Sequence, residues 1–596
     1  MKSKFKMKER FLTTTAIENT WYKDRPLLFL GEWCKIYDRH YVWEGIDSIT
    51  VPYHWDDRRK LYIDYLYLQQ LYEELLSELA DKLNEIHSTD YSLRYWRILV
   101  GPWLFYFIGI LFDRWEMIKK ANSDFSIAGV KILEIEPAQV VPNDMAEFND
   151  LITKDAWNEV IYGELIRDWT NISIEKVQSD QSFLQSNVLL KLNPTKWLKH
   201  KLFDIVSAFT QISIREDEAF LYASYLPIYQ NVILQLQLKQ LPKIWKKLLV
   251  PQVAVRLDQR QWKIGKSKLV DFPAIIRAMI PRHIPIIYLE GYNLLNKISN
   301  SLNWPKKPSL IFTSNSFFSD DVFKVWSAEK AEKGVPFIIG QHGGSYGMSP
   351  IAPLEEHEYA ISDIWLSWGW SDKNRPQIKP VFNLKLVGAK QSWDPDGKAL
   401  MVEMLIPRYS YRLLNFPIAD QWLNYFADQC RFVNALPIEI RRKLIVRLSN
   451  QDYGWKQKKR WYDNYPNINL DIGEIPIAKL LKKTRIYIST YNATTFLESM
   501  SMNIPTIMFW NQYYFEIRDS AIPYFEQLKI IGIFHETPES AARQMTKVWD
   551  DVGKWWNSKP VQDVREEFCY QYSRMPEKPL NKLRTILQNI AKVSID

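Results

Sequence analysis

The hydrophobic pattern of the last third of the chain alternates between short apolar runs and helical periods. A turn at residues 393–397 (WDPDG) precedes the first run. Alternating strands and helices are typical of a parallel, doubly wound sheet. The pattern therefore predicts a Rossmann-like domain after this turn, with strands at residues 399–406, 443–448, 467–470, 485–490 and 505–510.

The first part of the chain shows the same rhythm less regularly. Between about residues 120 and 300 prolines interrupt the helical pattern, and we interpret this region as an elaboration of the first domain without a predicted topology. The elements predicted elsewhere are a β-α-β unit at 309–315, 320–333 and 336–342, a buried strand at 26–30, a long amphipathic helix at 56–87, and short strands at 364–370 and 385–387.

Two segments bear on contact with a membrane. Residues 98–112 are strongly apolar but too few to span a bilayer, so they predict a buried helix. Residues 238–250 (LKQLPKIWKKLLV) mix lysines with leucines and Trp245, a pattern that fits a helix on an anionic membrane surface. We favour the alternative, an ordinary amphipathic helix with its lysines in solvent.

Composition narrows the class of protein. A chain of 596 residues is expected to fold as two or more domains, and its 25 Trp and 32 Tyr either fill cores or line sites for flat or sugar-like ligands. Three distant cysteines indicate neither disulfides nor a zinc site. A net charge of +8 without a basic tract argues against nucleic acid as a partner. The basic N-terminus lacks the apolar run of a secretory signal, so we expect a cytoplasmic protein.

Hydroxyl side chains gather where one predicted strand of the second domain passes into a helix. The strand ends at Ser489 and Thr490, and the helix begins near Thr494 and Thr495. Ligands bind beyond the carboxyl ends of parallel strands, and a helix N-terminus offers free N–H groups to phosphate. The alternative is a capping box, because Thr495 and Glu498 match that signature. We favour ligand binding, since capping needs only one or two of the four hydroxyls.

Six short motifs along the chain are informative together. They are residues 29–34 (FLGEWC), 52–57 (PYHWDD), 92–97 (SLRYWR), 340–347 (GQHGGSYG), 452–455 (DYGW) and 485–498. With these motifs the sequence resembles, over nearly its whole length, a bacterial family of O-antigen or surface-carbohydrate transferases, and the strand, hydroxyl-rich loop and helix at 485–498 resemble the donor site of GT-B glycosyltransferases. More distantly it is similar to capsule enzymes that transfer ulosonic sugars such as Kdo or pseudaminic acid from CMP donors.

The resemblance implies an α/β fold of the GT-B type. Two Rossmann-like domains would face a cleft, the first enlarged by mostly helical insertions. We expect an acceptor-side domain at residues 1–392, a domain that binds the nucleotide sugar at 393–560, and a C-terminal helix at 561–596 that packs back across both.

The glycine-rich turn after strand 336–342 is a second candidate site. Gly343 and Gly344 allow the backbone to approach a ligand closely. His342 is a candidate general base for an acceptor hydroxyl or a donor to a phosphate oxygen. The alternative is a histidine with only a structural role in the turn.

Three basic residues near strand ends are candidate phosphate ligands. By the resemblance, Lys390 and Arg408 flank the donor at the start of the second domain, and Arg447 ends one of its strands. Lys390 and Arg408 are each equally well interpreted as a solvated surface charge. CMP-dependent relatives carry a His-Pro pair after the corresponding strand, whereas this chain has Ser449-Asn450, so the donor nucleotide stays open.

A catalytic carboxylate is expected from the first domain. Glu32 is the first choice, because it directly follows the first predicted strand, and Asp56 and Asp57 are the next. Asp56 and Asp57 alternatively serve only the helix N-terminus. Glutamates 355, 356 and 358 around His357 either face the cleft or lie in a solvated loop. Asp394-Pro395-Asp396 has the letters of a metal-binding motif but lies in the turn between domains, so no metal is predicted.

Together these features predict a cytoplasmic glycosyltransferase of capsule or O-antigen assembly. Its expected partners are a nucleotide sugar and a glycan or lipid-linked glycan acceptor. The resemblance implies that the nucleotide sugar is CMP-linked. Peripheral contact with the inner membrane is a further expectation. The donor is a substrate, and no separate cofactor is expected. The alternatives are a CDP-alcohol phosphotransferase like those of teichoic acid synthesis and a non-catalytic glycan-binding protein.

Overall fold

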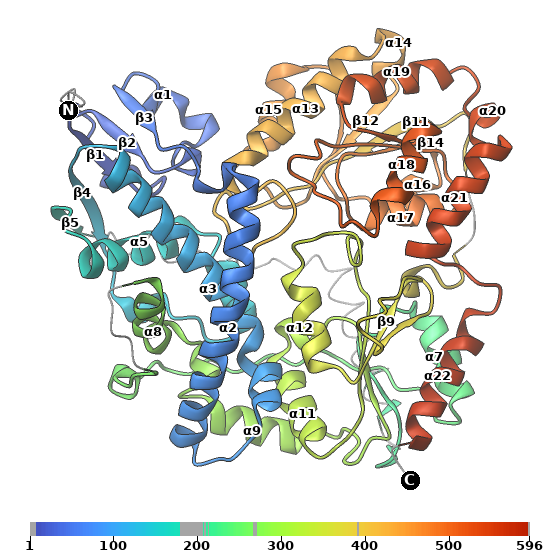
Figure 1. Ribbon diagram of the computed structural model, residues 1–596, viewed down its shortest axis with the longest axis horizontal. Helices are drawn as coiled ribbons and strands as arrows, with labels where there is room; N and C mark the ends of the chain where they lie inside the picture. Colours follow the sequence, from blue (N-terminus) through green and yellow to red (C-terminus); the bar gives the residue numbers. More distant parts are fainter. Residues whose placement is uncertain are drawn as a thin grey trace.

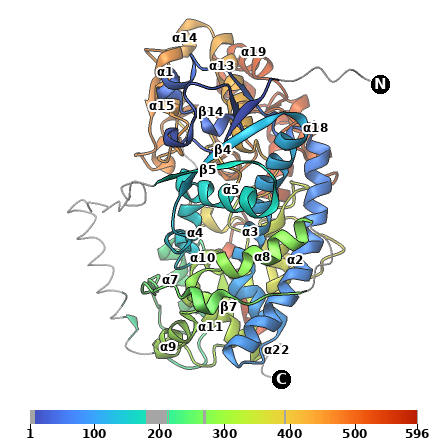
Figure 2. The ribbon, with the colours of Figure 1, turned by 90° about the vertical axis from the view of Figure 1, so that its left-hand side faces the viewer.

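The computed structural model describes residues 8–178, 207, 210–211, 214–265, 271–389 and 393–593. Three sheets of parallel strands organise this part of the chain. The N-terminal and C-terminal sheets lie at one end of the molecule and the middle sheet lies at the other (Figures 1 and 2).

The N-terminal sheet has the strand order β3-β2-β1-β4-β5, which reverses direction at β1 as in a doubly wound fold. The predicted strand at residues 26–30 is confirmed as β2, whose three residues are buried. The other strands carry polar or charged positions, so they lack a continuous apolar run. The elements are β1 Arg10–Thr13, β2 Leu27–Phe29, β3 Ser48–Thr50, β4 Ile127–Glu134, β5 Ile174–Gln178, α1 His40–Trp43, α4 Met145–Leu151 and α5 Asp155–Trp169.

The middle sheet has the order β10-β9-β8-β7-β6 and contains the predicted β-α-β unit as β7, α11 and β8. The strand predicted at residues 385–387 is wrong, because these residues overlap a 3-10 helix at Leu384–Leu386. The elements are β6 Phe220–Leu221, β7 Ile311–Thr313, β8 Phe337–Gly340, β9 Ile364–Ser367, β10 Ile378–Pro380, α7 Ile228–Gln237, α8 Phe272–His283, α9 Tyr292–Ser301, α10 Ser316–Ser319, α11 Asp321–Glu332 and α12 Pro353–Ile361.

The C-terminal sheet has the order β13-β12-β11-β14-β15-β16, and its first five strands along the chain confirm the five predicted ones. Its elements are β11 Lys398–Val402, β12 Leu444–Arg447, β13 Asn469–Asp471, β14 Thr484–Ser489, β15 Thr506–Phe509, β16 Phe534–His535, α13 Trp422–Ala435, α14 Ile438–Arg441, α15 Gln457–Asn464, α16 Ile477–Leu481, α17 Thr494–Ser501, α18 Ile522–Ile530, α19 Pro538–Val548 and α20 Val552–Trp556.

Two long helices run through the molecule between the N-terminal and middle sheets (Figure 1). The predicted helix at residues 56–87 is confirmed as α2 (Arg58–His87), capped by the Asp57 carboxylate. The apolar segment at 98–112 lies inside α3 (Leu93–Asp124). By length and composition α3 could cross a membrane, but its most apolar stretch is entirely buried in the protein. It is therefore a core helix of the fold, as predicted.

Residues 238–250 do not form the predicted amphipathic helix. Helix α7 ends at Gln237, and Lys239 adopts a left-handed backbone conformation with φ of 61°. Pro242 then prevents a new helical turn, and the segment continues as coil. Lys243 is buried, 4.0 Å from the Glu218 carboxylate, rather than in solvent.

The end of the chain connects the C-terminal domain to the middle sheet. Helix α21 (Lys559–Tyr572) packs against α17 and α18, and α22 (Pro579–Val593) lies beside α7 (Figure 1). Leu583 and Leu587 of α22 are buried in one cluster with residues of the middle sheet. The expected α/β fold of the GT-B type is confirmed, and the structure adds a parallel sheet where helical insertions were expected. The expected domain boundary adjoins residues 390–392, which lie outside the described residues.

Candidate functional site

A cavity of about 330 Å³ lies where the middle and C-terminal domains meet. We call it the cleft cavity. The carboxyl ends of β8, β11 and β14 all lead into its walls, which is where open parallel sheets bind ligands. Its lining comes from α3 (Phe105, Tyr106), the turn after β8 (residues 342–346), residues 349 and 351–355, the loop after β11 (residues 412–416) and the start of α17 (Ala493, Thr494).

The glycine turn after β8 touches the start of α17 directly. The Gly344 backbone N–H donates a hydrogen bond of 2.9 Å to the Thr494 hydroxyl. A Cβ atom at Gly344 would lie only 2.2 Å from the Ala493 carbonyl oxygen. The close approach of the two domains therefore requires glycine at this position, and it brings the two predicted sites together in one cavity.

Replacing Gly344 with alanine is expected to lower the stability of the protein by about 1–3 kcal/mol, because the new methyl group must displace the backbone of α17. Thermal unfolding of the purified variant measures this effect. Gly343→Ala is the matched control, since a Cβ there would lie at least 3.6 Å from other atoms. Equal melting temperatures for the two variants would contradict the close contact.

His342 lines the cavity within a chain of hydrogen bonds. Its Nε2 lies 3.2 Å from the Tyr346 hydroxyl, which donates to the buried Glu358 carboxylate at 2.5 Å. Burial, with the nearby cations Arg412 and Lys385, lowers the pKa of His342 to about 4. The imidazole is therefore neutral at pH 7 and able to accept a proton.

Arg412 is a cleft residue that the sequence reasoning missed. It lines the cavity, and its buried Nε atom has no hydrogen-bond partner. Within the described ranges no carboxylate forms an ion pair with Arg412, whereas most buried arginines of this chain are paired. A guanidinium without a carboxylate partner in a cavity is suited to bind phosphate. The sequence signal that could have identified Arg412 is its position four residues after Arg408, in the loop that follows β11.

The guanidinium of the predicted phosphate ligand Arg408 is already bound by other residues of the protein. It is buried and donates to the carbonyl oxygens of Trp33 and Tyr453, and it forms a 2.6 Å ion pair with Asp155. These contacts join the N-terminal and C-terminal domains. Because the whole guanidinium is engaged by the protein, we leave Arg408 out of the proposed donor site.

The other two predicted basic ligands do not line the cleft cavity. Arg447 is ion-paired with Asp471 and also donates to the Ile475 carbonyl oxygen at 2.7 Å. It ends β12, two strands away from β14 in the sheet. Lys390 lies outside the described residues.

The hydroxyls after β14 divide into two groups. Ser489 and Thr490 are buried and bond to backbone carbonyl oxygens, Thr490 to Val402 at 2.7 Å, so they hold the loop in place. Thr494 faces the cleft cavity, and Thr495 is half-buried beside it. The buried Asn492 amide in the same loop has no hydrogen-bond partner on either polar atom, a further feature that was not singled out from the sequence.

The capping-box alternative is wrong. The N-cap of α17 is Ala493, which has no side-chain cap, so the helix N-terminus is not satisfied by a hydroxyl or carboxylate. Glu498 instead forms a 2.6 Å ion pair with Lys385 of the middle domain. This pair is a second bridge between the domains, beside the Gly344 contact.

Glu32 and Asp56 lie away from the cleft cavity. Glu32 forms a 2.9 Å ion pair with Lys35, and Asp56 accepts a hydrogen bond from Gln421. Both carboxylates lie near Asp420, whose pKa is raised by burial and then by these two neighbours. Among the described residues no group of three or more His, Cys, Asp or Glu side chains is placed to hold a metal ion. Metal-independent chemistry stays a prediction.

The carboxylates around His357 belong to helix α12, so the solvated-loop alternative is wrong. Glu355 and Glu358 are buried. Glu355 accepts from the Gly347 N–H and pairs with Arg518 of the C-terminal domain at 3.1 Å. Glu358 supports Tyr346 and has a pKa raised well above its usual value by burial. These residues position the wall of the cleft cavity.

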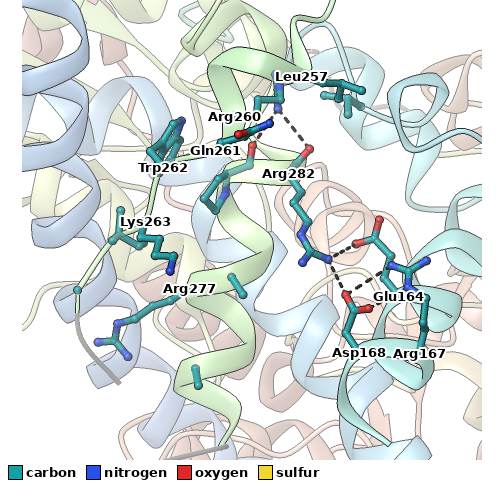
Figure 3. Close-up of a pocket in the computed structure, with 16 residues that line it drawn as sticks. Glu164, Arg167, Asp168, Leu257, Arg260, Gln261, Trp262, Lys263, Arg277 and Arg282 are labelled. Atoms are coloured by element: carbon teal, nitrogen blue, oxygen red, sulfur yellow. Dashed lines mark hydrogen bonds and ion pairs between the residues drawn. The ribbon is translucent and has the colours of Figure 1, made fainter. Parts of the chain in front are cut away.

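A larger cavity, about 690 Å³, lies outside the cleft between α5, α8 and residues 257–265 (Figure 3). Arginines line it, but carboxylates neutralise most of them. Figure 3 shows Arg282 reaching Asp168 and Glu164, with separations of 2.7 and 3.6 Å. Arg260 is likewise held by Glu290 at 2.7 Å. The cavity borders residues 266–270, which are outside the described part of the chain, and we assign it no ligand.

The fold and the cleft cavity define an α/β protein of the GT-B type with a candidate ligand cavity between parallel-sheet domains. The chain belongs to the LIC12162 family of transferases, whose family model matches residues 10–587. No curated protein matches it in sequence. The assignment as a transferase rests on the family model.

Three of the solved structures with partial similarity to this chain are the following. The wall teichoic acid polymerase TagF has a TM-score of 0.32 at 12% identity, over 67% of this chain and 97% of that chain. The spinosyn rhamnosyltransferase SpnG has a TM-score of 0.28 at 14% identity, over 50% of this chain and 76% of that chain. Os79 from O. sativa, solved in complex with UDP, has a TM-score of 0.29 at 12% identity, over 52% of this chain and 83% of that chain.

Proposed function

We propose that this transferase is a glycosyltransferase, which moves a sugar from a nucleotide donor to a glycan hydroxyl in the cleft cavity. One observation carries the proposal: a neutral histidine and an arginine without a carboxylate partner line the same cavity, at the carboxyl ends of parallel strands. These two groups suit sugar transfer from a nucleotide, because the histidine can serve as a base for the acceptor hydroxyl and the arginine can stabilise the leaving phosphate.

In the proposed reaction the acceptor hydroxyl attacks the anomeric carbon of the donor sugar. His342 takes the hydroxyl proton as the new C–O bond forms. The bond from the sugar to the phosphate oxygen breaks, and the negative charge stays on the nucleotide. Arg412 and the uncapped N-terminus of α17 stabilise this charge, with the Thr494 hydroxyl and the Asn492 amide as further contacts.

The finer proposal follows the sequence resemblance. We propose a donor linked to CMP, with an ulosonic sugar such as Kdo or pseudaminic acid, and an acceptor of capsule or O-antigen assembly at the cytoplasmic face of the inner membrane. The donor enters as a substrate, and the proposal includes no other cofactor. Thr495 would then lie beside the bound nucleotide, and Arg447, which is held by Asp471, is not part of the proposed donor site.

Thermal unfolding with a panel of nucleotides tests the proposal. CMP, UDP, CDP and CDP-glycerol are each added to the purified chain, and a nucleotide at about a hundred times its dissociation constant is expected to add about 2.7 kcal/mol of stability. Stabilisation by CMP supports the finer proposal. Stabilisation by UDP alone would indicate a UDP-linked donor in place of a CMP-linked one. Preference for CDP-glycerol over CDP indicates the phosphotransferase instead. Stabilisation by none of the four contradicts nucleotide-dependent transfer.

A further inference from the structure

A second, polar cavity of about 250 Å³ lies on the other side of helix α12. We call it the His357 cavity. It shares Phe105 and Pro353 with the cleft cavity, so the two are separated by little more than the start of α12. Its lining is mostly polar and consists of Gln69, Tyr72, Glu73, Arg97, Phe105, Pro353, Glu356, His357, Tyr359, Ala360, Arg375 and Gln377.

The most unusual feature of this cavity is His357 itself. Its side chain is 4% exposed, and neither ring nitrogen has a hydrogen-bond partner. A buried polar group without a partner is energetically costly, so such groups in native proteins usually meet a ligand or ordered water. The side-chain amides of Gln69 and Gln377 also have no hydrogen bond to another described residue. The cavity therefore offers several unused donors and acceptors at once.

The charges of the cavity are balanced. Arg97 donates two hydrogen bonds of 2.6 Å to Glu73, and Arg375 pairs with Glu356 at 2.7 Å. Burial, together with the cations Arg97 and Lys324, lowers the pKa of His357 to about 3, so its ring is neutral at pH 7. A neutral imidazole has one donor and one acceptor, which matches a hydroxyl group. Paired charges leave no net attraction for a phosphate or a carboxylate.

The size of the cavity indicates one ring rather than a single solvent molecule. Its volume is several times the roughly 30 Å³ that a water molecule occupies in the liquid. It is slightly below the range of about 300–1,000 Å³ that is typical of sites for drug-sized ligands. A single pyranose offers hydroxyls in several directions, whereas an apolar ring would leave the unused groups of His357, Gln69 and Gln377 without partners.

We propose that the His357 cavity binds one neutral, hydroxyl-rich sugar ring, with hydroxyls of the ring bonded to His357, Gln69 and Gln377. Because the cavity shares a wall with the cleft, this ring would belong to the glycan acceptor, a role that rests on the proposed glycosyltransferase function. Binding of the sugar itself does not depend on that function.

The test uses full-length protein with ¹³C-labelled histidine Cε1 positions. The probes are methyl glucopyranoside, methyl galactopyranoside and methyl mannopyranoside, with glucuronate as the charged comparison. The His357 signal is identified by its loss in His357→Phe. At least one neutral pyranoside is expected to shift it saturably below about 100 mM, and Gln377→Ala is expected to weaken that binding by about tenfold. The His342 signal serves as the internal reference for the cleft.

Absence of a saturable shift at His357 with all three neutral sugars would overturn the proposal and indicate a water-filled cavity. Glucuronate binding more tightly than the neutral sugars would also overturn it. Gln377 is half-buried, so its replacement keeps the test informative if His357→Phe folds poorly. Nucleotide stabilisation is measured separately, so failure of sugar binding at His357 and failure of the glycosyltransferase proposal are distinguishable.

Discussion

Replacing His342 with alanine is expected to lower kcat by about 10²–10⁴-fold, the usual contribution of a positioned general base. The acceptor hydroxyl would lose the group that takes its proton, while the nucleotide contacts of Arg412 and α17 remain. Nucleotide affinity is therefore expected to stay unchanged. The measurement is release of nucleotide from the donor identified by thermal unfolding, with calorimetry for the affinity.

The pH profile adds an independent check on His342. Its pKa of about 4 means that the neutral, proton-accepting form predominates above pH 5. The rate constant kcat/KM should therefore be flat between about pH 5 and 8 and should fall only as the ring protonates near pH 4. A decline that begins near the ordinary histidine value of 6.5 would contradict the buried environment.

His535→Ala is the matched control for His342→Ala. His535 is also a half-buried histidine with a lowered pKa, but it lies on β16 and bonds to Gly532 and Ser540. Its replacement should leave kcat unchanged. Full activity of His342→Ala would remove this residue from the proposed catalytic role.

Replacing Arg412 with alanine is expected to weaken nucleotide binding by about 10–100-fold, because a charge-assisted hydrogen bond contributes about 1.5–3 kcal/mol. The variant should keep its fold, since Arg412 forms no ion pair with a described carboxylate. Arg412→Lys should restore part of the affinity, because lysine keeps the charge but not the planar fork. Calorimetry with the most stabilising nucleotide measures all three proteins.

Arg408→Met separates a phosphate ligand from a structural arginine in the same loop. It would remove the ion pair with the half-buried Asp155 carboxylate and the hydrogen bonds to the Trp33 and Tyr453 carbonyl oxygens, and is expected to cost about 1–3 kcal/mol of stability. The folded variant should bind nucleotide as the wild type does. The opposite pattern, with lost affinity in Arg408→Met and normal affinity in Arg412→Ala, would reverse the assignment of the two residues.

The strands β11, β12, β14 and β15 of the C-terminal sheet were predictable because each contains a run of apolar residues. A strand buried on both faces carries this signal in its own residues, as in β15 (Thr506–Phe509), where every residue is buried. The N-terminal sheet was only partly predictable. Strand β5 (Ile174–Gln178) has a half-buried, alternating pattern, and it becomes a strand by pairing with β4.

The residues of the candidate site were also only partly predictable from the sequence. His342, Gly344 and Thr494 could be selected from the sequence because strand ends and glycine turns mark positions next to a ligand. The distinction between Arg408 and Arg412 could not, since two arginines in one loop have the same local chemistry. Only the tertiary contacts decide which one meets a carboxylate and which one remains available.

The sequence by itself determined the α/β class, five strands of the C-terminal sheet and the turn and loop that face the cleft, because these depend on local hydrophobic pattern and backbone preference. The tertiary structure alone decided that Gly344 meets Ala493 across the domains, that Glu498 pairs with Lys385, and that His357 is buried without a partner. Each of these joins residues distant in the chain, and its energy depends on packing and desolvation, which no local pattern encodes.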